Sequence, residues 1–168
     1  MVDRSVHDFD GIRIDTRDWP LVLMEMPAHP VPDTSVHQAL WYLERLMKRT
    51  PPDERFFQVT DLSSMRDVAP ARQRKYSAEW AKRTAPFARH CRIGGAIVAK
   101  SSLLRGMLTA VFWLAKPEGP THVVSTRREG LLCAIHALEA TGPLPAHLSQ
   151  LRDRLLAPPR RTAAAATI

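Results

Sequence analysis

The chain has 168 residues, an apolar fraction of 45% and a formal net charge of +7 at neutral pH. This length predicts one domain that buries a sizeable core, and the apolar fraction is ordinary for a globular chain. Two cysteines, Cys91 and Cys133, are too few for a disulfide framework, so we expect reduced thiols. The longest apolar run, Leu103 to Ala115, contains Arg105 and is shorter than the roughly 20 residues of a membrane span. Because the N-terminus shows no apolar signal segment, we expect a cytoplasmic protein.

Apolar patterning and turn residues predict strands that alternate with helices along the chain. The predicted strands are 12–15, 21–26, 55–62, 93–99 and 121–125, and the predicted helices are 33–49, 70–91, 101–115 and 126–141. A short amphipathic helix is expected within 143–157. Residues 1–8 are expected to be a flexible N-terminus, residues 9–142 the domain, and residues 158–168 a disordered tail.

The most apolar part of the chain predicts a strand, a serine turn and a helix. The strand covers Ile93 to Ala99, and Ser101 or Ser102 is the expected N-cap of the helix. Such a pair usually lies in the middle of an α/β sheet, where both faces are covered. The apolar helix around Trp113 can exceed what one domain covers, which makes a homo-oligomer one alternative.

The element order β-β-α-β-α-β-α-β-α predicts an α/β fold. Strands that are separated by helices should be parallel, whereas the hairpin formed by the first two strands is antiparallel. We therefore expect a mixed, mostly parallel sheet of about five strands with flanking helices.

This order, together with Asp61-Leu62-Ser63-Ser64-Met65 at the end of the third strand, resembles the STAS domain of anti-anti-sigma factors. The similarity is greater to the STAS/SEC14-type anti-anti-sigma-factor-like proteins. It is carried further by the strand and Leu-Leu-Arg-Gly segment of 93–106 and by the Val123-Val124 strand before an amphipathic helix. The resemblance covers about residues 10–140. It implies a small α/β domain that docks to other proteins, often in bacterial signalling.

In anti-anti-sigma factors, a serine at the start of the helix after the third strand is phosphorylated. An alignment on Asp61-Leu62-Ser63 places Val68-Ala69-Pro70-Ala71 at that helix start, so no serine occupies the position. We therefore expect a domain that lacks the phosphorylation switch. We interpret Ser63 and Ser64 as turn residues.

The carboxyl ends of the parallel strands are the expected location of a functional site. The first candidate is a partner-docking rim formed by Asp61, Ser63, Ser64, Arg66, Asp67 and Ala69. The second is an anion site at helix N-termini, formed by Lys100, Ser101, Ser102, Arg105, Thr126 and Arg127. A structural alternative pairs Arg105 with Asp61 or Asp67. The structural alternative for the serines and threonines of the second candidate site is that they cap helices.

The sequence offers no grouping for catalysis, a metal or a cofactor. Its seven histidines are scattered and do not show the spacing of metal ligands. Gly94-Gly95 lies at the start of a predicted strand, whereas the glycines of a nucleotide-binding motif follow a strand. The predicted helix 70–91 is basic, but its aromatic residues belong to the buried face, which favours a solvated face over a nucleic-acid groove. The sequence thus predicts a non-enzymatic, STAS-like protein-interaction module. A nucleotide or phosphate-ligand binder and a basic nucleic-acid binder are the alternatives.

Overall fold

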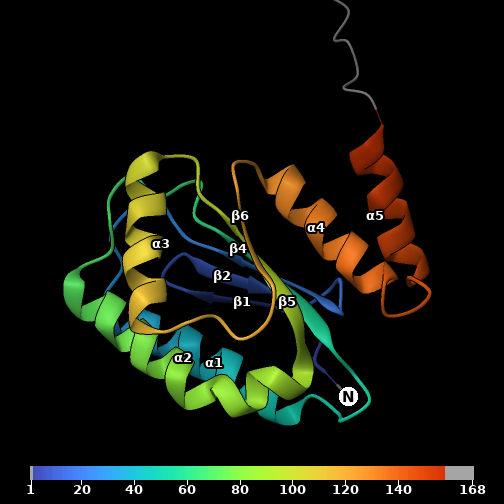
Figure 1. The fold of residues 1–168 in the computed structure, drawn as a ribbon, viewed down its shortest axis with the longest axis horizontal. Helices are drawn as coiled ribbons and strands as arrows, with labels where there is room; N and C mark the ends of the chain where they lie inside the picture. The colour runs from blue at the N-terminus through green and yellow to red at the C-terminus, as the bar shows by residue number, and fades with distance from the viewer. Residues whose placement is uncertain (1, 158–168) are drawn as a thin grey trace, which may run out of the picture.

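The computed structural model describes residues 2–157, and they form one six-stranded sheet with five helices (Figure 1). The elements are β1 (Val6–Phe9), β2 (Ile12–Asp15), β3 (Leu21–Glu25), α1 (Asp33–Arg49), β4 (Phe56–Asp61), α2 (Ala71–Cys91), β5 (Arg92–Val98), α3 (Ser102–Leu114), β6 (Thr121–Val124), α4 (Arg127–Glu139) and α5 (Ala146–Leu156). The strands lie in the sheet in sequence order. The α/β class and the mostly parallel sheet are therefore confirmed.

Strand β1 is an addition to the five predicted strands. It pairs antiparallel with β2 through a tight turn in which Asp10 and Gly11 have φ angles of 51° and 88°. An Asp-Gly pair favours this turn because both residues tolerate a positive φ. Residues 6–8 were expected in a flexible N-terminus, but they lie in this strand.

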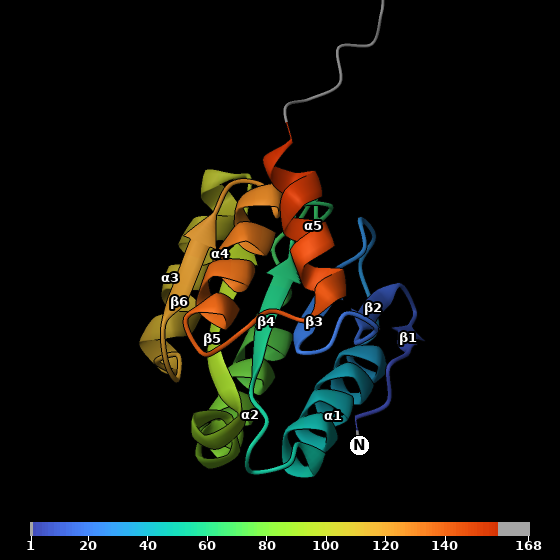
Figure 2. The same ribbon diagram turned by 90° about the vertical axis from the view of Figure 1, so that its right-hand side faces the viewer.

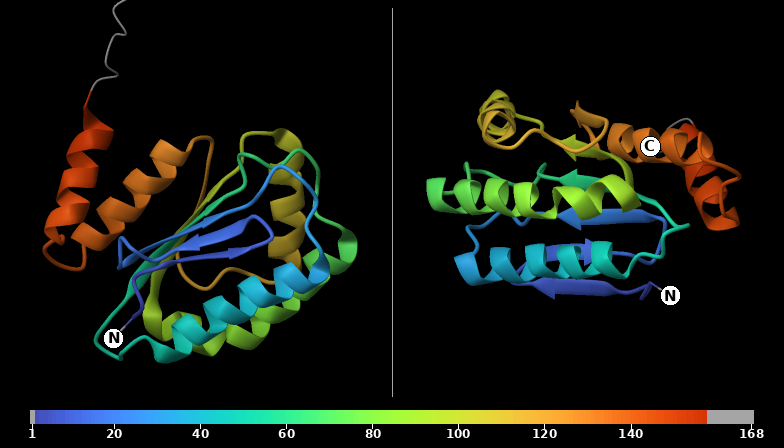
Figure 3. Two further views of the ribbon diagram at one scale, coloured as in Figure 1. Left: turned by 180° about the vertical axis from the view of Figure 1, so that it is seen from behind. Right: turned by 60° about the horizontal axis from the view of Figure 1, so that its bottom comes forward.

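The remaining ladder follows the prediction, because β2 and β3 are antiparallel and β3, β4, β5 and β6 are parallel. Helices α1 and α2 pack on one face of the sheet against Val22, Met24 and Phe56. Helices α4 and α5 lie on the other face, where α4 packs against Val59 and Val98 (Figures 2 and 3). The two faces of each strand alternate between these cores.

Helix α4 approaches the sheet at Gly130. A Cβ atom at this position would lie 3.1 Å from Val98 Cγ2 and 3.2 Å from Val59 Cγ1. The helix begins with a capping box, which the sequence Thr126-Arg127-Arg128-Glu129 favours: Thr126 Oγ1 accepts from Glu129 N, and the Glu129 carboxylate accepts from the Thr126 amide. The cap fixes the helix start, and the glycine permits the close approach.

Helix α3 is less covered than the sequence predicts. Ser101 caps it as expected, with its hydroxyl accepting from Leu104 N at 3.2 Å. Only Leu104 and Leu108 of this helix are buried, whereas Trp113 is 86% exposed. The reason is its position: α3 packs beside α2, and Leu104 and Leu108 cluster with Ala99 and with Ile97 of β5. Among residues 2–157, no further strand or helix covers its outer side (Figure 1).

The C-terminal helix expected within 143–157 is α5, and it packs against α4. The tail predicted for 158–168 lies outside the described residues. Among residues 2–157, no helix combines the length and the apolar character needed to cross a membrane.

Candidate functional site

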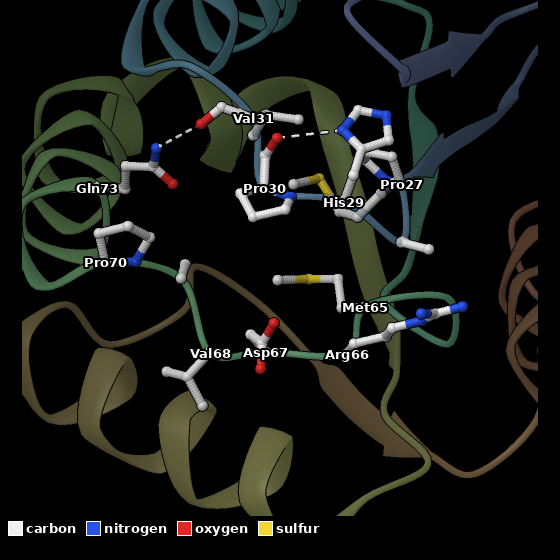
Figure 4. A pocket seen from close by; sticks show the side chains of 13 residues that line it. Pro27, His29, Pro30, Val31, Met65, Arg66, Asp67, Val68, Pro70 and Gln73 are labelled. Carbon is white, nitrogen blue, oxygen red and sulfur yellow. Dashed lines mark hydrogen bonds between the residues drawn. The ribbon is translucent and has the colours of Figure 1, made fainter.

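A hollow of about 130 Å³ lies at the carboxyl ends of β3 and β4 (Figure 4). One wall is the segment between β3 and α1, and the other is the segment between β4 and α2. The lining is formed by Met26, Pro27, Ala28, His29, Pro30, Val31, Met65, Arg66, Asp67, Val68, Ala69, Pro70 and Gln73. Its volume is close to the roughly 150 Å³ of a cavity that accepts a benzene ring. The hollow can therefore take one large apolar side chain or a ligand of that size.

Both walls are fixed by hydrogen bonds. Gln73, in the first turns of α2, donates from Nε2 to Val31 O at 3.0 Å and to Asp33 Oδ1 at 2.8 Å. Arg74 donates to Ala69 O at 2.6 Å and holds the end of the second wall. Proline residues add stiffness to both segments because each fixes its own φ. The hollow is thus a property of the folded loops.

Methionine gives the hollow an adaptable lining. Met65 extends into the opening from the second wall, opposite Pro30 and Val31 (Figure 4). A methionine side chain is flexible and polarisable, so it can adjust to the shape of what it contacts. Arg66 and Asp67 beside it are exposed and bring one charge of each sign to the rim. This arrangement suits an apolar anchor with polar neighbours.

The six residues of the predicted docking rim occupy three different environments. Ser64, Arg66 and Asp67 are exposed, Ser63 and Ala69 are half-buried, and Asp61 is buried. Asp61 Oδ1 accepts from Ser63 N at 2.8 Å and so shapes the turn that follows β4. Arg66, Asp67 and Ala69 line the hollow, whereas Asp61, Ser63 and Ser64 do not.

Asp61 and Glu25 also face the N-terminus of α4. Arg127 forms an ion pair with Glu25, and its Nη1 atom lies 4.0 Å from Asp61 Oδ2. Arg13 approaches the same Glu25 carboxylate at 3.2 Å. Two arginines and two carboxylates therefore balance each other at this edge of the sheet. The predicted role of Arg127 in anion binding competes with these pairs.

Several residues of the predicted anion site already have hydrogen-bond partners within the fold. Arg105 donates to Ala99 O at 3.1 Å and to Ser125 Oγ at 2.6 Å, so it pairs with neither Asp61 nor Asp67. Ser101 and Thr126 cap their helices, and Glu129 accepts from the amides of Ser125 and Thr126. The remaining two residues, Lys100 and Ser102, are exposed. The caps account for the serine and threonine hydroxyls without any ligand.

The first wall of the hollow, residues 26–31, was not among the predicted site residues. Pro27 and Pro30 in this segment favour irregular backbone, but nothing in the sequence indicates that the segment lies opposite residues 65–70. The parallel register of β3 with β4 brings the two segments together, since Glu25 is opposite Asp61. Strand adjacency was the missing information.

Within 2–157, no three histidine, cysteine or acidic side chains gather where they could hold a metal ion. Burial raises the pKa of both cysteine thiols, Cys91 and Cys133, which opposes thiolate formation. Several basic residues of α2 pair with carboxylates, namely Arg72, Lys75, Arg83 and Arg89. This pairing reduces the basic character of the helix.

Comparison with known proteins adds no relative to this description. No family model matches the chain, and no curated protein matches it at a significant level.

Proposed function

We propose that this chain is a non-enzymatic, STAS-like protein-interaction module of bacterial signalling or regulation. Its docking surface is the hollow between residues 26–31 and 65–70, together with the exposed rim residues Ser64, Arg66 and Asp67. The observation that supports the proposal most strongly is the Met65-lined hollow, which is open, mostly apolar and of side-chain size. Protein interfaces concentrate their binding energy in a few anchors that fill such pockets.

The partner that fits is a protein with one large apolar side chain flanked by charged residues. The apolar side chain enters the hollow, while Arg66 and Asp67 at its edge contact the flanking charges. Helix α2 begins after Pro70 with Ala71, so no hydroxyl is present at the helix start where the resembled family carries its phosphorylated serine. The proposed binding is therefore constitutive and independent of phosphorylation at that position.

The test is a quantitative capture experiment with the tagged full chain and extract of the native cell, followed by titration of the purified partner. Met65→Gln replaces the apolar lining at similar size, and Asp67→Arg reverses a rim charge. Asp53→Arg is the matched control, because Asp53 is exposed and lies before β4, at the opposite end of that strand. We expect both rim variants to weaken binding at least tenfold and the control to bind within twofold of wild type. Capture of no partner, or equal binding by all variants, would contradict the proposal.

A further inference from the structure

Three of the eight large hydrophobic residues that are exposed in the described part of the chain lie on the outer face of α3. Leu103 is 60% exposed, Leu114 is 53% exposed and Trp113 is 86% exposed. Between them lie Gly106 and Ala110, which are also exposed. These five positions follow helical spacing and therefore share one side of the helix. The buried Leu104 and Leu108 are on the opposite side, toward the sheet.

We propose that this face binds a second copy of the same chain and that two α3 helices pair antiparallel in a homodimer. The five residues of this face do not line the hollow at residues 26–31 and 65–70, although Val68 borders both surfaces, so the inference goes beyond the proposed function and does not rest on it. It rests on the arrangement of large and small residues, on the charge of the face and on its area.

The order of side chains along α3 is symmetric about Leu108. Leu103 and Trp113 each lie five residues from Leu108, and Gly106 and Ala110 each lie two residues from it. In an antiparallel pair whose twofold axis passes at the level of Leu108, Leu103 of one copy lies level with Trp113 of the other. Gly106 then lies level with Ala110. A twofold interface requires such self-complementarity.

The sizes of these residues suit close packing. Small residues in the middle allow two helices to approach, and large residues at both ends close the interface over them. A Cβ atom on Gly106 would meet no other atom within 4 Å, so the middle of the face is open. The hollow beside it, between α3 and residues Val68 and Arg74, leaves room for a neighbouring molecule.

The distribution of charge over the surface favours self-association through this face. The whole chain carries a net charge of +7, so two copies repel each other over most orientations. The face formed by Leu103, Gly106, Ala110, Trp113 and Leu114 contains no charged side chain. Two copies can therefore meet here with no like charges on the face itself, and Arg74, at the border of the neighbouring hollow, is held by its hydrogen bond to Ala69 O.

The available area predicts a dimer of modest affinity. A buried aromatic side chain contributes about 200 Å², and the half-exposed leucines add roughly 100 Å² each. The sum of about 400 Å² per copy is half of the roughly 800 Å² per partner in a standard stable interface. With the contacts of Gly106, Ala110 and their neighbours added, we expect a micromolar dissociation constant.

Sedimentation equilibrium of the full chain between about 1 and 500 µM tests the proposal. Wild type should change from monomer to dimer over this range, and Trp113→Ala should raise the dissociation constant at least tenfold. Trp41→Ala is the matched control, because Trp41 is 56% exposed on α1 and should leave the constant within twofold. Circular dichroism confirms that both variants fold. A monomeric wild type, or equal loss in both variants, would overturn the proposal.

Cross-linking tests the antiparallel register. In a Cys133→Ser background, an equal mixture of the Gly106→Cys and Ala110→Cys proteins should form a disulfide between different copies faster than either protein alone. Native Cys91 is buried and does not interfere. Equal rates in the mixture and in the single proteins would contradict this register. Binding of a strictly monomeric chain to anionic lipid vesicles through Trp113 would assign the face to a membrane surface and overturn the dimer.

Discussion

Two glycine-to-alanine substitutions in helices should change stability in opposite directions. Gly106 lies in α3 and Gly130 lies in α4, and both are interior helix positions. In each case the alanine gains about 1 kcal/mol of helix propensity. At Gly106 nothing lies within 4 Å of the added Cβ, so Gly106→Ala should stabilise the protein by that amount.

At Gly130 the same methyl group meets a rigid surface. It would lie 3.1 and 3.2 Å from methyl groups of Val98 and Val59, both of which are 0% exposed. Valine has few rotamers, so these neighbours cannot move aside cheaply. Overpacking of this kind costs about 1–3 kcal/mol. After the propensity gain, Gly130→Ala should destabilise the protein by up to about 2 kcal/mol.

Urea unfolding followed by circular dichroism measures both effects. The protein concentration should be about 1 µM, so that dimerisation through α3 does not contribute. Thermal unfolding gives a second readout, in which each kcal/mol should move the thermal midpoint by about 2–4 °C for a chain of this size. The difference between the two variants isolates the packing cost, because the change in propensity is common to both. If both substitutions stabilise the protein equally, α4 does not lie against Val98 and Val59 in the way described.

Three further predictions concern single side chains. Asp61→Ala removes the acceptor for Ser63 N and should cost about 1–3 kcal/mol in urea unfolding, whereas Asp67→Ala, at an exposed position, should stay within about 0.5 kcal/mol of wild type. Glu129→Ala breaks the capping box of α4 and should cost about 1 kcal/mol, while Glu129→Gln keeps an acceptor and should retain most of the stability; equal losses would argue against the cap. Hydrogen bonds from Lys48 and Arg83 hold the pKa of Glu44 below its ordinary value. The ionised Glu44 carboxylate therefore stabilises the fold above the ordinary pKa of glutamate, and this contribution is lost as the pH falls through the lowered pKa. In urea unfolding at a series of acidic pH values, Glu44→Gln should show a smaller change of unfolding free energy with pH than wild type.

The sequence predicts most elements of the fold because their signals are local. The amphipathic pattern of 33–49, the capping box at Thr126 and the serine cap of α3 all lie within a few residues of the structure that they determine. Strand β1 was not predicted, because Val6–Phe9 has only four residues and its polar and apolar residues do not alternate. Tertiary pairing with β2 stabilises this strand.

The candidate site was only half predictable. Residues 66, 67 and 69 were assigned to a rim from the end of the third predicted strand, and they do line the hollow. The opposing residues 26–31 depend on which strands are neighbours, and sequence patterning does not provide this. The hydrogen bond of Arg105 to Ser125 was not predicted for the same reason. Ser125 lies 20 residues further along the chain, and the pairing of β5 with β6 brings it close to Arg105.

The order of strands in the sheet has a consequence for how the chain is made. Each strand from β2 to β6 pairs with the strand that precedes it in the sequence. During synthesis from the N-terminus, a new strand therefore finds its neighbour already present and never waits for one that is still to be translated. Each pairing spans a single hairpin or crossover, so no strand must wait for a partner from the far end of the chain, although the parallel pairings of β3 to β6 are non-local and form more slowly than the hairpins. The sheet can grow by one strand at a time as the chain leaves the ribosome, with α4 and α5 covering its second face last.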